Sequence, residues 1–330
     1  MNCNHTFTLF IIGMAGSGKS TLVNNLSKEF SNNNHKNFII NLDPASKNLN
    51  YIPNIDIRDT VDYKKVMRIY NLGPNGAIMA SLNLFSTRFD QIQKIIKKNS
   101  SKIEFIIIDT PGQLEVFTWS ASGSIITECF LSNSPVLILY VIDLSKILNP
   151  INFTTNILYS CSTLYKTKIP SLTLVNKIDI TSIDFFIEWY CDSNNLDTSF
   201  QENGLFIESF RRSLSLVLDS FNQKIIYIGI SSLKNIGLTK INNYINKLKL
   251  EFEFFFQKEL EKSVKKNFKD LICKNKIDRK LVAHKRNSFN INSNLLSEKK
   301  EYYLILEYLL HLKYEKDLVK DLNFVAIESV

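Results

Sequence analysis

Eight consecutive residues near the N-terminus combine glycines with a lysine and a serine at a spacing that suits phosphate binding. The run is Gly13-Met14-Ala15-Gly16-Ser17-Gly18-Lys19-Ser20, in which two glycines enclose four residues and Lys-Ser follows. The glycines allow backbone turns in which N–H groups face a phosphate chain. Lys19 supplies a positive charge beside the outer phosphates, and the Ser20 hydroxyl is placed to bind Mg²⁺. The residues predicted to hold the phosphates are Gly13, Gly16, Ser17, Gly18, Lys19, Ser20 and Thr21.

A second candidate site follows an apolar run in the middle of the chain. Asp109-Thr110-Pro111-Gly112-Gln113 comes directly after an expected strand at residues 103–108. An acid at the end of a buried strand, followed by a glycine, is typical of the magnesium side of a P-loop site. We expect Asp109 to hold Mg²⁺ through its water shell. The Gly112 N–H is then placed to sense the terminal phosphate, and Gln113 to lie near the attacking water.

Asp43 is a third candidate, because it ends the short apolar strand expected at residues 38–42. Ligands gather at the carboxyl ends of parallel strands, so Asp43 should lie on the same sheet edge as the phosphate loop. It is therefore a candidate carboxylate near Mg²⁺ and the attacking water. Asp43-Pro44 is equally well explained as the opening of a turn. The residues alone leave these two interpretations open.

A fourth motif indicates which base is bound. The expected strand 172–175 ends in Asn176-Lys177-Ile178-Asp179. A carboxylate such as Asp179 can accept hydrogen bonds from both the ring N–H and the exocyclic amine of guanine, a donor pair that adenine lacks. Asn176 can meet the base edge, Lys177 can lie along the ring, and the backbone at Ser232 can cover the guanine oxygen. In this chain order the four motifs predict GTP rather than ATP.

The elements that must position these residues alternate between apolar strands and helices. Residues 8–12 form the expected first strand, and apolar residues at helical spacing from Leu22 to Phe30 follow the glycine loop. This alternation predicts the α/β fold class, as a P-loop NTPase three-layer sandwich with a mostly parallel sheet. Further strands are expected at 136–142 and 224–228, and further helices at 59–69, 78–96 and 241–255.

Composition limits the other possibilities. The chain has 330 residues, of which 45% are hydrophobic, and this is enough for one large domain with an extension. The five cysteines are scattered and form no CxxC pair, which favours reduced thiols inside the cell, and four separated histidines argue against an imidazole metal site. The apolar runs are shorter than a membrane span, so we expect no membrane association.

We predict a P-loop GTPase domain at residues 1–258, with a helical insertion at about 182–220 and a C-terminal extension at 259–330. The insertion is rich in aromatic residues, which core packing explains more readily than a binding groove. Residues 262–286 hold ten Lys or Arg against two Asp, so most of the net charge of +8 lies there. A solvated helix or coil is the favoured interpretation of this basic stretch, and an RNA-binding or nuclear-import patch is the alternative.

One further segment is explained by a resemblance. Gly73-Pro74-Asn75 taken alone predicts only a tight turn. With its surroundings, from about residue 6 to residue 258, the chain resembles the GPN-loop GTPases. Within that family it is most similar to the first eukaryotic paralogue, which is linked to assembly and nuclear import of RNA polymerase II. The matching segments are Asn41-Leu42-Asp43-Pro44-Ala45, Asn54-Ile55-Asp56-Ile57-Arg58-Asp59-Thr60-Val61, Leu82-Asn83-Leu84-Phe85 and Asp109 through Trp119-Ser120-Ala121-Ser122-Gly123.

The resemblance implies a dimer with facing nucleotide sites, in which Asn75 enters the partner's site near the γ-phosphate. It also implies that Asp43 positions the water or the metal, assisted by Gln113, while Lys19 stabilises the transferring phosphate. The insertion would then border an apolar client groove. The tail departs from the family pattern, because that paralogue usually has an acidic extension and this one is basic and then apolar.

Together these expectations describe a Mg²⁺-dependent GTPase that hydrolyses GTP to GDP and phosphate. As the resemblance implies, it would act as a dimeric switch, as a homodimer or with a paralogous GPN-loop GTPase, with RNA polymerase II subunits or assembly factors as partners. Its expected location is the cytoplasm, with possible shuttling to the nucleus. One alternative is a nucleotide-gated, chaperone-like binding module with negligible hydrolysis. A P-loop ATPase or kinase is disfavoured by Asn176 and Asp179.

Overall fold

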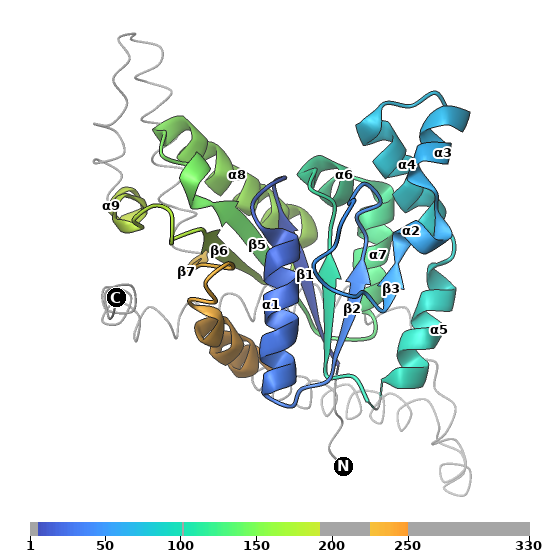
Figure 1. The fold of residues 1–330 in the computed structure, drawn as a ribbon, viewed down its shortest axis with the longest axis horizontal. Coiled ribbons are helices and arrows are strands. Elements are labelled where there is room, and N and C mark those ends of the chain that lie inside the picture. Colours follow the sequence, from blue (N-terminus) through green and yellow to red (C-terminus); the bar gives the residue numbers. More distant parts are fainter. Residues whose placement is uncertain (1–5, 101, 192–224, 250–330) are drawn as a thin grey trace, which may run out of the picture.

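The fold is built on a seven-stranded parallel sheet, seen in a computed structural model that describes residues 6–100, 102–191 and 225–249 (Figure 1). The strand order is β3-β2-β4-β1-β5-β6-β7, and each neighbouring pair is parallel. The strands are β1 (Phe7–Gly13), β2 (Asn37–Asn41), β3 (Ile55–Asp56), β4 (Phe105–Asp109), β5 (Val136–Asp143), β6 (Ser171–Asn176) and β7 (Ile226–Ile230). The α/β class is therefore confirmed, and the sheet is parallel throughout its described strands.

Helices connect these strands in the manner of parallel α/β folds. They are α1 (Lys19–Asn32), α2 (Ile57–Thr60), α3 (Tyr63–Ile69), α4 (Pro74–Ser86), α5 (Phe89–Asn99), α6 (Leu114–Thr118), α7 (Ala121–Leu131), α8 (Pro150–Thr167) and α9 (Asp184–Cys191). A 3₁₀ turn, η1 (Leu144–Lys146), follows β5, and residues 238–249 form a further helix.

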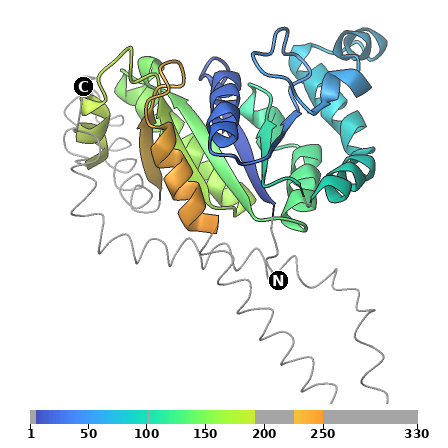
Figure 2. The same cartoon turned by 60° about the horizontal axis from the view of Figure 1, so that its bottom comes forward.

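Both faces of the sheet are covered, which explains why β1, β4 and β5 are buried at every position and consist mostly of apolar residues. The side chains of β1 alternate between the faces. Phe10 packs on Phe117 of α6 and Phe130 of α7, with ring centroids 5.8 and 5.6 Å apart. On the opposite face, Phe105 of β4 stacks on Phe30 of α1 at 4.3 Å. Figure 2 shows α1 and the helix at 238–249 on one face and α8 on the other.

Two helical segments differ from the sequence-based expectation. The helix expected at 59–69 is two short helices, because Val61 is extended and the Asp62 side chain caps a new helix by accepting from the N–H groups of Lys64 and Lys65. The helix expected at 78–96 is likewise divided, since α4 ends at Ser86 and α5 begins at Phe89. Apolar periodicity continued across both breaks and concealed them.

The Gly73-Pro74-Asn75 segment begins a helix and does more than form a turn. Gly73 is the N-cap residue of α4 and Pro74 is its first residue. Proline is favoured there, because its missing N–H would have no partner within the helix and its φ angle is already helical. Asn75 thus lies in the first turn of α4, where it is exposed.

Two predicted segments fall largely outside the described residues. The insertion at 182–220 is described only as far as Cys191, including α9, which packs through Phe186 and Trp189 on Phe153 of α8. Residues 250–330, including the basic stretch, are not among the described residues. Within the described part of the chain, each helix is too short or too polar to cross a membrane.

Candidate nucleotide-binding site

The phosphate loop lies between β1 and α1, and its backbone conformation requires glycine at three positions. Gly16 and Gly18 have φ angles of 79° and 95°, a left-handed conformation that other residues rarely adopt. A Cβ atom on Gly13 would lie only 2.4 Å from the carbonyl oxygen of Val141 on β5. The loop therefore keeps its shape only with glycine at these three positions.

Lys19 is buried at the centre of this loop. Its Nζ atom donates to the carbonyl oxygens of Gly13 at 2.9 Å and Met14 at 3.1 Å. Burial lowers the pKa of Lys19, while the nearby carboxylates Asp109 and Asp43 act to raise it. The positive charge of Lys19 thus lies near two acids that come from the ends of β2 and β4.

The predicted magnesium side is assembled around Asp109. Ser20 Oγ donates to Asp109 Oδ2 at 2.8 Å, which joins the start of α1 to the end of β4. Burial raises the pKa of Asp109, although hydrogen bonds from Ser20 and Tyr51 act to lower it. The second carboxylate oxygen, Oδ1, is buried without a protein partner.

Ser20 and Asp109 fit a magnesium ion that is held mainly by nucleotide phosphates. Mg²⁺ prefers oxygen ligands and usually takes only one or two from the protein. Among the described residues, no group of three or more His, Cys, Asp or Glu side chains could hold a metal ion by itself. The hydroxyl of Ser20 and the free Oδ1 of Asp109 provide the required oxygen atoms next to the phosphate loop.

Asp43 combines the two interpretations that the sequence left open. Its Oδ1 accepts from the N–H of Ala45 at 2.9 Å, which is the hydrogen bond of an Asp-Pro turn. The same carboxyl group lies close enough to Lys19 for their charges to interact, and burial raises its pKa above the usual range. Asp43 therefore forms the turn and also lies on the same sheet edge as the phosphate loop.

Gly112 and Gln113 lie against the phosphate loop. A Cβ atom on Gly112 would lie 3.1 Å from Cβ of Ala15, a closer contact than side chains normally make. Gln113 is the N-cap residue of α6, and its Oε1 is buried without a partner. Thr110 Oγ1 donates to the carbonyl oxygen of Ile11 at 2.7 Å, which fixes the start of this segment to β1.

Asn176 connects the predicted base-binding motif with the phosphate loop. Its Nδ2 donates to the carbonyl oxygen of Ser17 at 2.7 Å, and its Oδ1 accepts from the N–H of Ser232 at 2.9 Å. Ser232 also accepts from Asn25 of α1 through its carbonyl oxygen. Three segments far apart in the sequence are therefore held together by one buried carboxamide.

Lys177 and Lys146 hold the outer side of the phosphate loop. Lys177 Nζ donates to the carbonyl oxygen of Gly16 at 2.9 Å and forms a 2.6 Å ion pair with Asp143. Lys146 Nζ donates to the carbonyl oxygen of Ala15 at 3.2 Å. Lys177 also has a φ angle of 71°, a strained conformation for a non-glycine residue and one that is concentrated at functional sites.

Asp179, the predicted base-binding carboxylate, is held by a neighbouring serine. Its Oδ1 accepts from Ser231 Oγ at 2.6 Å, which fixes the carboxyl group beside the segment that follows β7. The carboxylate keeps further acceptor positions for the N–H groups of guanine. Asp179 and Ser232 thus lie on the two segments that the sequence predicted to surround the base.

Asn75 is the one predicted site residue that lies apart from these motifs. It is exposed in the first turn of α4, and Figure 1 shows α3 and α4 together beyond the β3 edge of the sheet. The residues that the structure brings together are the phosphate loop, Asp43, Asp109 to Gln113, and Asn176 to Asp179.

Sequence reasoning missed Tyr51 and the Asp56–Arg58 pair. Tyr51 OH donates to Asp109 Oδ2 at 2.8 Å from the irregular segment between β2 and β3. Asp56 forms an ion pair with Arg58 at 2.6 Å and accepts from Asn41 Nδ2 at 3.0 Å. Arg58 in turn donates to the carbonyl oxygen of Ser46. An isolated tyrosine in a loop carries no sequence signal, whereas Asp56 and Arg58 lie in a segment on which the resemblance to the GPN-loop GTPases rests.

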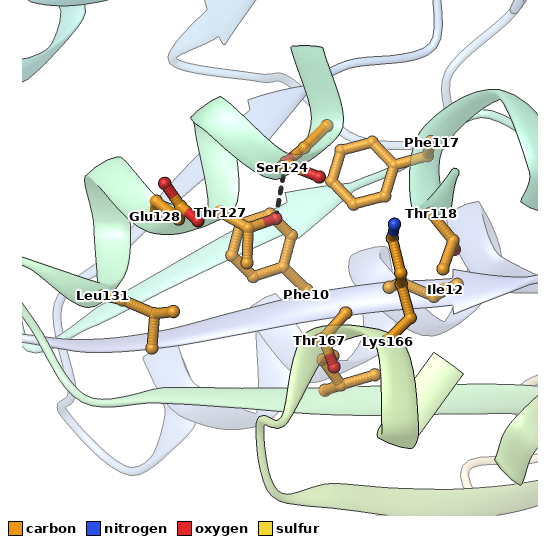
Figure 3. Close-up of a pocket in the computed structure, with 12 residues that line it drawn as sticks. Phe10, Ile12, Phe117, Thr118, Ser124, Thr127, Glu128, Leu131, Lys166 and Thr167 are labelled. Atoms are coloured by element: carbon orange, nitrogen blue, oxygen red, sulfur yellow. Dashed lines mark hydrogen bonds between the residues drawn. The ribbon is translucent and has the colours of Figure 1, made fainter. Parts of the chain in front are cut away.

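A separate small pocket lies on the α7 and α8 face of the sheet (Figure 3). Phe10 and Phe117 form part of its apolar lining, and Lys166 and Glu128 lie at its polar side. Thr127, which also lines it, donates to the carbonyl oxygen of Gly123 at 2.7 Å. The residues of the four motifs do not line this pocket, so it is distinct from the candidate nucleotide site.

Comparisons with known proteins show which family the sequence resembles. The family model described as "Conserved hypothetical ATP binding protein" matches residues 11–250, well over half of the chain. GPN-loop GTPase 1 of Dictyostelium discoideum is 44% identical over 79% of this chain, and the match spans 66% of that relative, slightly less than two thirds of its length. GPN-loop GTPase 1 of Saccharomyces cerevisiae is 42% identical over 78% of this chain and 69% of its own.

One solved structure supports the fold alone. A GTPase from Pyrococcus abyssi, solved in its apo form, aligns with a TM-score of 0.63 at 23% identity, covering 74% of this chain and 97% of that protein. The sequence relatives, the family model and the four motifs at one sheet edge lead to the same conclusion. The chain belongs to the GPN-loop GTPase family.

Proposed function

We propose that this chain is a Mg²⁺-dependent GTPase that converts GTP to GDP and phosphate. The observation that carries the proposal is the hydrogen bonding of Asn176, because its carboxamide joins the phosphate loop at Ser17 to the base-side segment at Ser232. A phosphate cradle and a guanine-specific motif therefore share one site, as GTP binding requires.

The residues around this site have distinct tasks in the proposed reaction. The N–H groups of the phosphate loop and the Lys19 ammonium stabilise negative charge on the transferring phosphate. Magnesium, when bound with the nucleotide, supplies further charge neutralisation, and Ser20 and Asp109 are the residues that would hold it. Asp43 and Gln113 orient the attacking water, and Gly112 contacts the terminal phosphate through its N–H.

The base is selected by Asp179. Its carboxylate can accept from two guanine N–H donors, while the hydrogen bond from Ser231 keeps it in place. The description of the family model mentions ATP, whereas the relatives are named GTPases. The preference for GTP over ATP is therefore the first property to measure. A direct competition between labelled GTP and unlabelled ATP tests it. Displacement of GTP by equimolar ATP would refute the proposed specificity.

We further propose that the functional unit is a dimer, with a second copy or with a paralogous GPN-loop GTPase. The exposure of Asn75 supports this, because a polar residue at the start of α4 is accessible to a neighbouring subunit. In the proposed dimer, Asn75 enters the partner's site near the γ-phosphate. Nucleotide state would then control the arrangement of the two subunits.

Asn75→Ala tests this role, with Asn83→Ala as the matched control because Asn83 is also exposed on α4. We expect Asn75→Ala to lower GTP turnover at least about tenfold, the effect of removing one positioning group near the reacting phosphate, with GTP affinity nearly unchanged. Asn83→Ala should match wild type. Wild-type turnover in Asn75→Ala would refute a catalytic role for this residue.

The proposed cellular role is assembly and nuclear import of RNA polymerase II, with cytoplasmic location and shuttling to the nucleus. Its support is the similarity to proteins named GPN-loop GTPase 1. Co-purification with polymerase subunits, with and without a non-hydrolysable GTP analogue, tests it. Capture that is independent of nucleotide, with negligible single-turnover hydrolysis, would instead identify a binding module that does not act as an enzyme.

A further inference from the structure

Tyr51 makes an unexpected contact with the candidate magnesium site. It lies in the irregular segment at residues 42–54, between β2 and β3, and its hydroxyl donates to Asp109 Oδ2 at 2.8 Å. The residue is only 7% exposed, whereas the next residue, Ile52, is 90% exposed. The ring of Tyr51 belongs to the main hydrophobic core, while its hydroxyl reaches a buried carboxylate.

The two carboxylate oxygen atoms of Asp109 differ in their hydrogen bonds. Ser20 Oγ and Tyr51 OH both donate to Oδ2, at 2.8 Å each, while Oδ1 is buried without a protein partner. Two donors on one oxygen fix the orientation of the carboxyl group. The other oxygen, Oδ1, keeps its acceptor capacity for magnesium or its water shell.

Tyr51 also anchors the segment that carries Asp43. The start of this segment is held by Asn41, whose Oδ1 accepts from the Asp43 N–H at 3.0 Å, and its end by Asn54, whose Oδ1 accepts from the Ile39 N–H at 2.8 Å. Between these ends, Tyr51 connects the segment to Asp109 on β4. The Tyr51 hydroxyl thus connects the segment that carries Asp43 to Asp109, the other acid proposed to serve water or metal.

We propose that Tyr51 is a positioning residue of the nucleotide site, whose hydroxyl orients Asp109 toward magnesium and holds the Asp43 segment against the end of β4. The proposal rests on the proposed function, because it requires nucleotide-bound magnesium at Ser20 and Asp109. Groups that hydrogen-bond to metal-binding side chains typically contribute 10- to 100-fold to metal affinity. Tyr51 would therefore act through Asp109, without itself touching the metal.

Tyr51→Phe tests this proposal, because it removes the hydroxyl and retains the ring. Tyr140→Phe is a matched control, since Tyr140 is buried on β5 and its hydroxyl has no partner. The measurement is the dissociation of a fluorescent GDP from the full chain at increasing free Mg²⁺. We expect the Mg²⁺ midpoint to rise about tenfold in Tyr51→Phe and to stay at the wild-type value in Tyr140→Phe.

A second readout follows the segment itself and does not depend on turnover. Lys47 is exposed in this segment and is a trypsin cleavage site. With Mg²⁺ and GDP present, we expect cleavage after Lys47 to be several-fold faster in Tyr51→Phe than in wild type or Tyr140→Phe. Unchanged cleavage would refute the role of Tyr51 in holding the segment.

The outcomes separate this proposal from the proposed function. If wild-type nucleotide release is insensitive to Mg²⁺, the magnesium site itself is refuted, and the role of Tyr51 with it. If wild type depends on Mg²⁺ but Tyr51→Phe has the same midpoint, only the role of Tyr51 in orienting Asp109 is overturned. A raised midpoint confined to Tyr51→Phe supports the assignment.

Discussion

Asn176 Nδ2 donates to the carbonyl oxygen of Ser17 at 2.7 Å, so the base-recognition motif is hydrogen-bonded directly to the phosphate loop. The contact is close enough that a Cβ atom on the adjacent Gly18 would lie 2.4 Å from the same Nδ2. The segments proposed to bind the phosphates and the base are therefore in direct contact. Disturbing either part should affect the other.

Asn176→Ala tests this coupling. The substitution leaves the buried carbonyl of Ser17 and the N–H of Ser232 without their partner, which typically costs about 1–3 kcal/mol for each group. We expect a lower free energy of unfolding in urea and a GTP affinity reduced about 10- to 100-fold. Asn156→Ala on α8 is the control, because its side chain bonds only within its own helix, to Asn152. Equal GTP affinity of Asn176→Ala and wild type would contradict the coupling.

Asp179→Asn should change the choice of base. An amide accepts only one of the two guanine N–H donors and offers its own N–H instead, which suits the exocyclic C2 carbonyl oxygen of xanthine. We expect GTP affinity to fall about 10- to 100-fold and affinity for xanthosine triphosphate to rise. Competition binding with both nucleotides measures this. Asp59→Asn, an exposed change in α2, should preserve GTP preference, and an unaltered preference in Asp179→Asn would exclude base contact.

Removal of magnesium should weaken nucleotide binding through Ser20 and Asp109. Chelation with EDTA is expected to speed GDP release about tenfold or more, and Ser20→Ala should require more Mg²⁺ to restore slow release. The alanine variant loses both the candidate ligand and the hydrogen bond to Asp109. Ser86→Ala on α4 is a matched control, since its hydroxyl bonds only to the local carbonyl of Asn83. A GDP release rate that does not change on addition of EDTA would contradict the magnesium site.

Gly112→Ala should distort the phosphate loop. The new Cβ would lie 3.1 Å from Cβ and 3.2 Å from Cα of Ala15, so one of the two segments must move. We expect slower GTP hydrolysis and a destabilisation of about 1–3 kcal/mol, typical of overpacking. A Cβ on Gly73 would meet no atom within 4 Å, so Gly73→Ala is the control for stability. Equal thermal unfolding of both variants would show that the contact relaxes freely.

The free energy of unfolding should vary with pH because the pKa of Asp43 differs between the folded and unfolded states. Burial raises its pKa in the folded protein above the unfolded value, so the folded state binds a proton more tightly. Asp43 therefore stabilises the folded state at low pH. This stabilisation is lost as the pH rises through the pKa that Asp43 has in the folded protein. In nucleotide-free protein with EDTA, Asp43→Asn should be less sensitive to pH across this window. A urea unfolding series from mildly acidic to neutral pH measures it, and identical pH profiles would contradict the assignment.

Much of this site was predictable because its residues follow strand ends. The glycine loop, Asp109 and Asn176 each come directly after an apolar run, and parallel strands bring such positions to one edge. The spacing of residues along the chain therefore indicated their proximity in space. Asp43 was predicted by the same reasoning, although only the structure shows that its turn and its nearness to Lys19 are compatible.

The remaining features depended on contacts that leave no periodic pattern. Tyr51 reaches Asp109 from an irregular segment, 58 positions earlier in the chain. The separation of α2 from α3 depends on a cap formed by Asp62, within a continuous apolar pattern. The roles of Lys146 and Asp143 beside the phosphate loop also require tertiary structure, because nothing in their local sequence indicates phosphate chemistry.

The position of Ser232 has a consequence for biosynthesis. Its N–H meets Asn176, which meets Ser17, so one ligand site depends on residues from both ends of the described domain. More than two hundred residues must therefore be synthesised before the segments of the proposed nucleotide site can meet. Until then, the emerging polypeptide has a complete glycine loop but lacks the segment that is proposed to close the guanine end.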